Sequence, residues 1–314
     1  MASPTLNEVS AVDPVLQNIL VGFAQSENRF VALNAFPGVS VGSPSGTFYK
    51  FTQKYWFVDG LAPRAAGAAF ARGGIGVETD TYETLQWGKE YPIARETEAA
   101  NQTPLALQQA GVRWLAQQSF IRKERAFATD FMKTGVWGTD DNNSATDWDD
   151  SSGAPITNIQ TAGLTVSQAT GMTANTAIMG EIVYNALLVN AQVLSAIQYT
   201  NTVTMAARQQ LLASVLGLDT LLVSRAVYNT VNEAQAMSLL PVIDDDCLVY
   251  YNNPGAGVFD ATAGKTFVWS PGGGAGSVRS YWEDQTNSDV LQHQEQWDQK
   301  LIANTLGYFF ADIV

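Results

Sequence analysis

The segment Gly38-Val39-Ser40-Val41-Gly42 matches the G-x-S-x-G pattern in which serine hydrolases place their nucleophile. Chain order also permits the other members of a catalytic triad, because aspartates and His293 follow Ser40. This chemistry needs a strand before the serine and a helix directly after it. The run Gly42-Ser43-Pro44-Ser45-Gly46 follows instead and cannot form a helix. We interpret the match as an irregular loop, with a serine hydrolase centred on Ser40 as an alternative.

Two further segments have residue types that bind charged ligands. The glycine-rich run 270–277 could present amides to a phosphate, but it lacks the G-K-[ST] ending of a nucleotide-binding loop and the G-x-G-x-x-G spacing of a dinucleotide site. The acidic segment 140–150 could bind Ca²⁺ or Mg²⁺, yet the sixth and twelfth EF-hand positions hold Ala145 and Ser151. We interpret these segments as a turn and a solvated loop. The acidic segment contains Asp140, Asp141, Asp147, Asp149 and Asp150.

Other reactive side chains are few. The chain has one cysteine, Cys247, and one histidine, His293, so a disulfide within the chain and sites built from several thiolates and imidazoles are excluded. We expect Cys247 to be a buried small residue at a strand start, and His293 to be an exposed or hydrogen-bonded residue within a strand. Asp244–Asp246 leaves a two-metal nuclease open as an alternative. The sequence otherwise predicts no catalytic residue, no cofactor and no metal site.

The composition indicates protein partners. The chain has 30 acidic and 17 basic residues and a net charge of -13, whereas binding of nucleic acid through its phosphates needs clustered Lys and Arg. An acidic container would repel a packed polyanion. Hydrophobic residues make up 46% of the chain and charged residues 15%, which suits a folded protein that buries its exterior against neighbours.

No segment resembles a targeting or membrane element. The first ten residues lack the basic and apolar regions of a signal peptide. The longest apolar runs, such as Leu239–Ile243, are too short to cross a bilayer. We therefore expect a soluble protein of the cytoplasm.

A long β-hairpin is predicted in the first third of the chain. Thr47–Asp59 and Gly76–Glu90 are rich in aromatic and β-branched residues and are typical of strands. Between them, Gly60–Gly74 is nearly all Ala, Gly, Arg and Pro, so the tip has few large side chains to anchor it. A hairpin without a core is marginally stable alone, and we expect it to lie on a partner surface. Its expected aromatic contact residues are Trp56, Phe57, Tyr82 and Trp87.

The clearest predicted element is a long helix. Thr103 and Pro104 provide an N-cap and a first turn, apolar residues recur at helical spacing, and Gly135 ends the run. About thirty residues at ~1.5 Å each give a rod of roughly 45 Å. The basic side of this rod is expected to face acidic loops or DNA. Its basic residues are Arg113, Arg122, Lys123, Arg125 and Lys133.

The remaining chain alternates between short elements. An arm with a helix starting at Asp13-Pro14 precedes the hairpin, and a polar loop at 139–153 follows the long helix. Short helices are predicted at 182–188, 191–199 and 205–216, and strands at 176–179, 221–223, 248–251, 266–269, 290–301 and 306–314. An arm, a hairpin and a rod are hard to pack as one sphere, and the apolar surface left open indicates partners.

This layout resembles the major capsid proteins of tailed bacteriophages, which have the HK97-type fold. Locally, Phe131-Met132-Lys133-Thr134-Gly135-Val136-Trp137-Gly138 is similar to the end of the spine helix in one group of these proteins. Ala226–Thr230 and Leu306–Phe310 are similar to other segments of that group. The resemblance implies an α+β fold with an N-terminal arm, an extended E-loop hairpin, a long spine helix in the P-domain and a mixed α/β A-domain.

The resemblance also implies boundaries and contacts. The expected regions are 1–46 for the arm, 47–98 for the E-loop, 99–165 for the P-domain with the spine helix, 166–276 for the A-domain, 277–302 for the P-domain return strands and loop, and 303–314 for an A-domain strand. The turn Gln285–Ser288 corresponds to the loop that meets its equivalents around local three-fold axes. The expected inter-subunit contacts are Lys54, Trp56, Arg64, Arg72, Arg122, Lys123, Arg125 and Asn287.

Some relatives join an E-loop lysine covalently to a P-domain asparagine. Lys54 or Lys50 and Asn287 lie in the corresponding segments of this chain. No motif fixes these residues, and the carboxylate that catalyses the reaction in those relatives is not placed by the sequence.

The function implied by the resemblance is structural and not enzymatic. We expect self-assembly into hexamers and pentamers of an icosahedral head around double-stranded DNA, formed in the host bacterial cytoplasm and retained in the virion. The chain is short ahead of its hairpin, so a separate scaffolding protein is expected, with portal and decoration proteins as further partners. An encapsulin-like compartment with the same fold is the alternative.

Overall fold

The fold is seen in a computed structural model that describes residues 29–51, 54, 57–61, 63–74, 76–100, 104–142, 147–197, 205–231, 236, 238–257 and 260–314. The helix expected at Asp13-Pro14 and the contact residue Trp56 lie outside these described residues. No helix in the described part of the chain combines the length and the apolar character that a membrane span requires.

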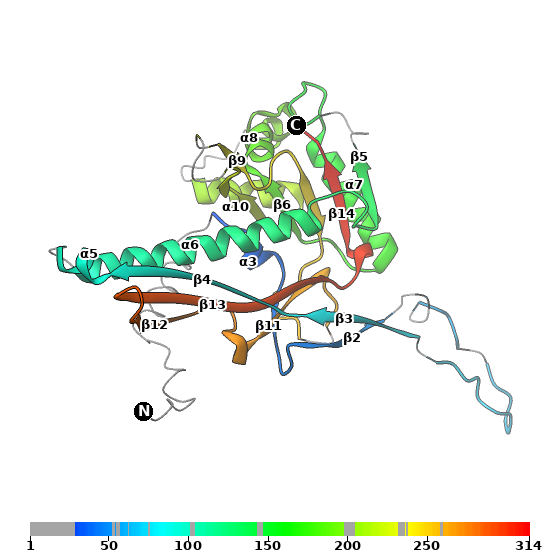
Figure 1. The fold of residues 1–314 in the computed structure, drawn as a ribbon. Coiled ribbons are helices and arrows are strands. Elements are labelled where there is room, and N and C mark those ends of the chain that lie inside the picture. The colour runs from blue at the N-terminus through cyan, green and yellow to red at the C-terminus, as the bar shows by residue number, and fades with distance from the viewer. Residues whose placement is uncertain are drawn as a thin grey trace.

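A five-stranded sheet is organised around one long strand, β13 (Figure 1). β13 pairs antiparallel with β4 along one edge and with β12 and then β11 along the other, and β1 adds to β11 in parallel. The turn predicted at Gln285–Ser288 joins β12 to β13, as expected. The strands are β1 (Gly38–Val41), β4 (Leu85–Ala94), β11 (Gly264–Trp269), β12 (Ser277–Glu283) and β13 (Ser288–Leu301).

The long helix α6 (Pro104–Phe131) runs along this sheet, with the short helix α5 (Arg95–Ala100) at its start (Figure 1). Its 28 residues correspond to about 42 Å at 1.5 Å each. The helix lies close to the sheet, because a Cβ on Gly111 would be 2.6 Å from the Tyr91 ring. Val112, Leu115 and Phe120 are buried in a core with residues of β4, β12 and β13. The predicted rod is therefore confirmed, although its last turn ends before Gly135.

A second five-stranded sheet has the order β5-β14-β10-β6-β7 and is packed against α7, α8 and α10. Every residue of β6 and β10 is buried, which matches the apolar runs that predicted these strands. The strands are β5 (Thr139–Asn142), β6 (Thr176–Gly180), β7 (Thr220–Ser224), β10 (Cys247–Tyr250) and β14 (Gly307–Ala311). The helices are α7 (Pro155–Thr170), α8 (Glu181–Val189), α9 (Ala191–Ile197) and α10 (Met205–Leu216), and η2 (Asn304–Leu306) precedes β14.

The hairpin of β2 (Ser45–Phe51) and β3 (Val77–Glu83) extends away from the body of the molecule (Figure 1). Beyond the paired strands, the described residues between 57 and 74 are exposed. A smaller hairpin is formed by β8 (Val227–Asn229) and β9 (Leu239–Pro241). Extended segments of this kind bury little of their own apolar surface within one chain.

Three local predictions were wrong. Gly38–Val41 is a strand and not a loop, because β11 offers it a free parallel edge. The segment 139–153 is not wholly a solvated loop, since β5 pairs with β14 and the Trp148 side chain is fully buried. The single strand predicted at Gly76–Glu90 is divided at Thr84, where the chain leaves β2 and joins β13. In each case a partner distant in sequence decided the outcome.

Residues 30–36 contain one short helix and pack into the core. α3 (Ala32–Ala35) lies against α6, and the Phe36 ring packs edge-on against Phe127, Phe131 and Tyr250 at centroid distances of 5.3, 4.9 and 6.1 Å. The Tyr250 hydroxyl donates a 2.6 Å hydrogen bond to the Ala35 carbonyl. This segment therefore fastens the long helix to the second sheet.

Phe36→Ala is expected to lower the free energy of unfolding by about 3–5 kcal/mol, because it leaves a cavity among three aromatic rings. Leu33→Ala, on the helix that directly precedes Phe36 but 42% exposed, is the matched control and is expected to cost under about 1 kcal/mol. Chemical denaturation of dispersed subunits measures both values. Equal losses in the two variants would contradict the central position assigned to Phe36.

Candidate assembly surfaces and their internal support

A buried ionic cluster joins α6 to β13. The Lys123 ammonium lies 2.6 Å from a carboxylate oxygen of Glu295, and the two side chains are 10% and 2% exposed. The Ser119 hydroxyl, one turn earlier on the helix, donates a 2.7 Å hydrogen bond to the same oxygen of Glu295. His293 Nε2 is 3.6 Å from it. Residues 293 and 295 share the face of β13 that lies beneath the helix.

The electrostatics of this cluster hold Glu295 in its charged form. Burial acts to raise the pKa of Glu295, but His293, the Lys123 charge and the hydrogen bonds from Lys123 and Ser119 outweigh it and lower the pKa to about 2. The carboxylate is therefore ionised across the whole neutral and mildly acidic range.

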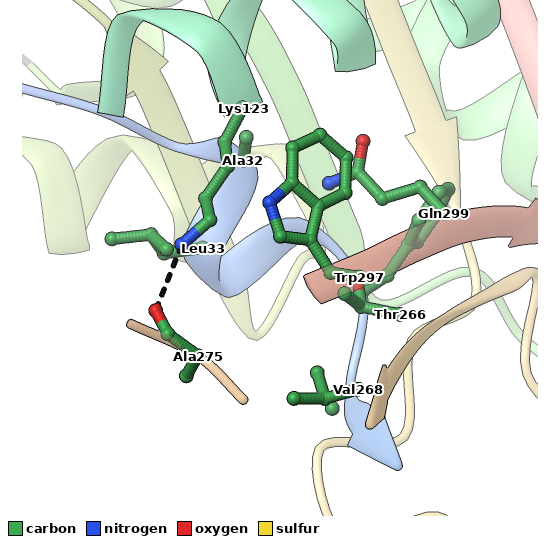
Figure 2. A pocket seen from close by; sticks show the side chains of 10 residues that line it. Ala32, Leu33, Lys123, Thr266, Val268, Ala275, Trp297 and Gln299 are labelled. Carbon is green, nitrogen blue, oxygen red and sulfur yellow. Dashed lines mark hydrogen bonds between the residues drawn. The ribbon is translucent and has the colours of Figure 1, made fainter. Parts of the chain in front are cut away.

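Lys123 also borders a cavity of about 150 Å³ on its other side (Figure 2). Its ammonium donates a 3.1 Å hydrogen bond to the Ala275 carbonyl, so one side chain connects α6 both to β13 and to the glycine-rich turn. The cavity is bounded mainly by apolar groups such as Trp297, Val268 and Phe36. Lys123 is thus an internal support of the sheet-and-helix layer.

The next helix residue, Glu124, faces different partners. Its carboxylate accepts hydrogen bonds from the Ala32 amide at 2.8 Å and from the Ser224 hydroxyl at 2.6 Å. Burial raises the pKa of Glu124, and these hydrogen bonds oppose the rise only in part. Because consecutive helical residues point about 100° apart, Lys123 and Glu124 hold the helix from two sides.

The basic residues predicted on the helix therefore differ in setting. Arg122 and Arg125 are exposed, with their guanidinium groups 4.1 Å from the Trp87 ring centroid and 4.4 Å from that of Tyr228. Lys123 points inward and is already paired within the chain. An inter-subunit contact by Arg122 or Arg125 stays a prediction. For Lys123 the same prediction competes with the internal role just described, because its charge is buried.

The hairpin presents the other predicted contact residues to solvent. Lys54, Arg64 and Arg72 are exposed, and the Arg64 guanidinium stacks 4.0 Å from the Phe70 ring centroid. Lys50 is engaged with Asp80 across the hairpin at 2.5 Å. The contact role of Lys54 stays a prediction.

Asn287 lies at the tip of the β12–β13 turn. It adopts a left-handed backbone conformation with φ of 48°, which asparagine tolerates better than most residues. Its side-chain amide donates a 3.0 Å hydrogen bond to Glu96 at the start of α5. The residue is exposed at one end of the long sheet, and its predicted contact with a neighbour stays a prediction.

Large apolar side chains are exposed on several projecting elements. On the hairpin, Leu61 is 96% exposed, Phe70 is 74% exposed and Phe57 is 65% exposed. Further apolar side chains are exposed at Val189 at the end of α8, at Leu194 in the middle of α9, and at Val227, Leu239 and Leu240 on the small hairpin. Exposed apolar side chains of this size are candidates for contacts with other molecules when they gather on one surface.

The residues considered for catalysis are not brought together. Ser40 lies on β1, where its hydroxyl is 3.2 Å from that of Ser270, and no helix follows the strand. His293 lies on β13, two strands away across β11 and four residues along from the position opposite Ser40. His293 is buried, and its Nε2 lies 3.6 Å from Glu295. These positions do not form a triad.

The candidate anion-binding and cation-binding segments form hydrogen bonds within the chain. The amides of Gly273, Gly274 and Gly276 donate to carbonyls within the same turn, which includes η1 (Ser270–Gly272). The Asp140 carboxylate accepts from the Gly135 amide, and that of Asp150 from the Ser152 amide. In the described part of the chain, no group of three or more His, Cys, Asp or Glu side chains is arranged to hold a metal ion.

Cys247 and Asp246, which the sequence analysis singled out, lie at the start of β10. Cys247 is fully buried at the start of β10, as predicted, and burial raises the pKa of its thiol. Burial and neighbouring aspartates raise the pKa of Asp246 to about 6. Its carboxylate accepts from the Asp312 amide at 3.3 Å, so this acidic run caps the end of β14.

Comparison with solved structures identifies the fold. The chain superposes on a phage-related protein from Bordetella bronchiseptica RB50 with a TM-score of 0.75 and 17% identity, covering 96% of this chain and 98% of that one. It matches a virus-like particle from Pyrococcus furiosus with a TM-score of 0.56 and 12% identity, over 94% and 97% of the two chains. It matches the capsid of Myoviridae phage XM1 with a TM-score of 0.52 and 11% identity, over 98% of each chain.

These likenesses extend over nearly the whole chain and establish the HK97-like α+β capsid fold expected from the sequence. No protein-family model matches the chain, and no curated protein matches it in sequence. The fold is thus recognised through its three-dimensional arrangement. Sequence reasoning missed the exposed apolar side chains Leu61 and Phe70, because Ala, Gly, Arg and Pro dominate the composition of the hairpin tip.

Glu295→Gln is expected to destabilise the subunit at pH 7 by about 3–5 kcal/mol, because it leaves the Lys123 charge buried without its partner. The pH dependence follows from the lowered pKa. Stabilisation by the Glu295 charge is fully present above its ordinary pKa of 4.5 and is lost as the pH falls toward 2, by about 3 kcal/mol.

Denaturant titrations of the wild type and the variant between pH 7 and pH 2 measure this difference. The gap between the two proteins should narrow below pH 4.5. Glu78→Gln, which removes an exposed carboxylate from the hairpin, serves as the control and should follow the wild type. A constant gap from pH 7 to pH 2 would contradict the role assigned to Glu295.

Proposed function

We propose that this chain is a major capsid protein that self-assembles, as hexamers and pentamers, into an icosahedral phage head around double-stranded DNA. The observation that carries the proposal is the projecting β2–β3 hairpin, whose tip exposes Leu61 and Phe70 to solvent. A ribbon with apolar side chains and no core of its own gains stability by lying on a neighbouring copy. The capsid fold of the chain supports this assignment.

Many contacts of modest strength would hold such a shell together. Each hairpin docks on one neighbour, while the exposed side chains of α8, α9 and the small hairpin offer further surfaces. Because each contact is repeated over a closed shell, small individual free energies sum to a large total. Arg122 and Arg125 belong to this proposal as contacts toward acidic segments of other copies.

The charge of the chain supports enclosure of DNA without specific binding. A net charge of -13 disfavours tight contact with phosphates, so packed DNA would slide within the shell instead of adhering to it. The proposed location is the virion, with assembly in the host bacterial cytoplasm. The proposed partners are a scaffolding protein, a portal and decoration proteins. No enzymatic activity is proposed.

An encapsulin-like compartment is the second candidate, favoured by the match to a virus-like particle from Pyrococcus furiosus. Such a shell would enclose protein cargo. Particles recovered from the native source are expected to contain nuclease-resistant double-stranded DNA, because the proposed function is a phage head. Extraction of nucleic acid after nuclease treatment measures it, and particles that hold protein cargo without DNA would favour the compartment.

Leu61→Ser combined with Phe70→Ser is expected to abolish particle formation while leaving the melting temperature of the dispersed subunit within about 2 °C of the wild type, because both side chains contribute little to the subunit core. Leu61→Met with Phe70→Leu is the matched control, since it keeps apolar bulk at both positions. Sedimentation velocity and electron microscopy measure particle yield. Normal particles from the serine variant would contradict the proposed docking of the hairpin.

A further inference from the structure

A second pocket, of about 190 Å³, lies between β4, α6 and β13 and includes Ser119 and Glu295 of the ionic cluster in its wall. The register of β4 on β13 places Trp87 opposite Glu295 and Lys89 opposite His293, so all four side chains share one face of the sheet. α6 covers this face. The polar residues that line the pocket are Trp87, Lys89, Gln118, Ser119, Arg122, His293 and Glu295.

Two buried groups in the pocket wall have no hydrogen-bond partner among the described residues. These are the Trp87 indole, through Nε1, and the His293 imidazole, whose Nδ1 and Nε2 both lack a partner and whose side chain is only 5% exposed. Buried polar groups without partners are rare in folded proteins because they lose their hydrogen bonds to water. An indole N–H can only donate, and an imidazole nitrogen can donate once it holds a proton. Both groups fit a ligand that accepts hydrogen bonds.

The charged side chains around the pocket also favour an anionic ligand. The Arg122 guanidinium lies over Trp87, and the Lys89 ammonium, which uses one hydrogen on Gln118 at 3.0 Å, has others available. The one carboxylate in the wall, Glu295, is already neutralised by Lys123. In a chain with a net charge of -13, the two cations Lys89 and Arg122 beside this paired carboxylate form a locally positive site.

We propose that this pocket binds one carboxylate group, and that the group is the side chain of an Asp or Glu of a second copy of this chain. The planar edge of Arg122 suits two parallel hydrogen bonds to a carboxylate, with Trp87, His293 and Lys89 completing the donors. No other carboxylate of the described chain lines the pocket, while 30 acidic residues per copy supply the group. The identity of the donor as a second copy rests on the proposed shell function.

The carboxylate chemistry is tested on dispersed full-length subunits with sodium acetate as the probe, at constant pH and ionic strength. His293 is the one histidine of the chain, so its imidazole C–H signal in an NMR spectrum reports on this pocket alone. A saturable shift of that signal is expected in the wild type. Arg122→Gln, which keeps size but removes charge, is expected to weaken acetate binding about tenfold, the loss of one charged hydrogen bond.

Arg113→Gln is the matched control, because Arg113 is exposed on the same helix and does not line the pocket. It is expected to bind acetate like the wild type. A linear shift, or the same affinity in all three proteins, overturns the proposal. Inorganic phosphate is titrated in parallel, and binding of phosphate about tenfold tighter than acetate would replace the carboxylate with a phosphate as ligand.

The source of the carboxylate is tested by assembly. If a second copy supplies it, Arg122→Gln gives at least about tenfold fewer particles than Arg113→Gln under the same conditions. Equal particle yields overturn the second copy as the source while the acetate result stands. Failure of the wild type itself to assemble counts against the proposed shell function and leaves the acetate titration interpretable, so the two failures are distinguishable.

Discussion

The orientation of the long helix is the constraint on which the rest of the molecule depends. Lys123 and Glu124 are consecutive and buried, and they bind on two different sides of the helix. Lys123 pairs with Glu295 on β13, while Glu124 receives hydrogen bonds from α3 and β7. A helix that slid or turned by one residue would leave the Lys123 charge and the polar Glu124 side chain buried without partners, which costs far more than imperfect packing of an apolar side chain. Apolar packing alone would permit such slippage, because neighbouring apolar side chains can exchange places at small cost.

This fixed layer gives the projecting parts a rigid base. β4 follows directly after the β2–β3 hairpin and pairs with β13 over ten residues, from Leu85 to Ala94. The hairpin is therefore anchored at its root by the same strand that carries Glu295. Its tip has no such support within the chain, since the large side chains there are exposed. The sheet-and-helix layer of such a subunit is rigid. Its projecting hairpin has exposed apolar side chains that contact with another copy would bury, as a shell protein requires.

The side chains around Glu295 have two separate roles: some hold the helix in place, and others line the pocket. Lys123 and Ser119 bind the same carboxylate oxygen of Glu295, so the charge of Glu295 is paired within the chain. The wall formed by Trp87, Lys89 and Arg122 retains donors beside the pocket. The buried Lys123–Glu295 pair on β13 thus has two effects. It fixes the orientation of the helix, and it leaves a positively charged site near the surface. The positive site depends on the pairing of Glu295 with Lys123, because an unpaired carboxylate at Glu295 would repel an anion.

The sequence by itself determined the elements whose signals are local. The proline at the helix start, the helical recurrence of apolar residues and the apolar runs of β6 and β10 predicted the rod and the buried strands, and the order of elements indicated the capsid fold. It could not determine which partner each segment meets. Ser40 became a strand residue because β11 offered it an edge, Trp148 entered the core because β5 joined β14, and Lys123 turned inward because Glu295, 172 positions later, faces it. Contacts between residues so far apart leave no periodic pattern in either segment, so only the tertiary structure decided them.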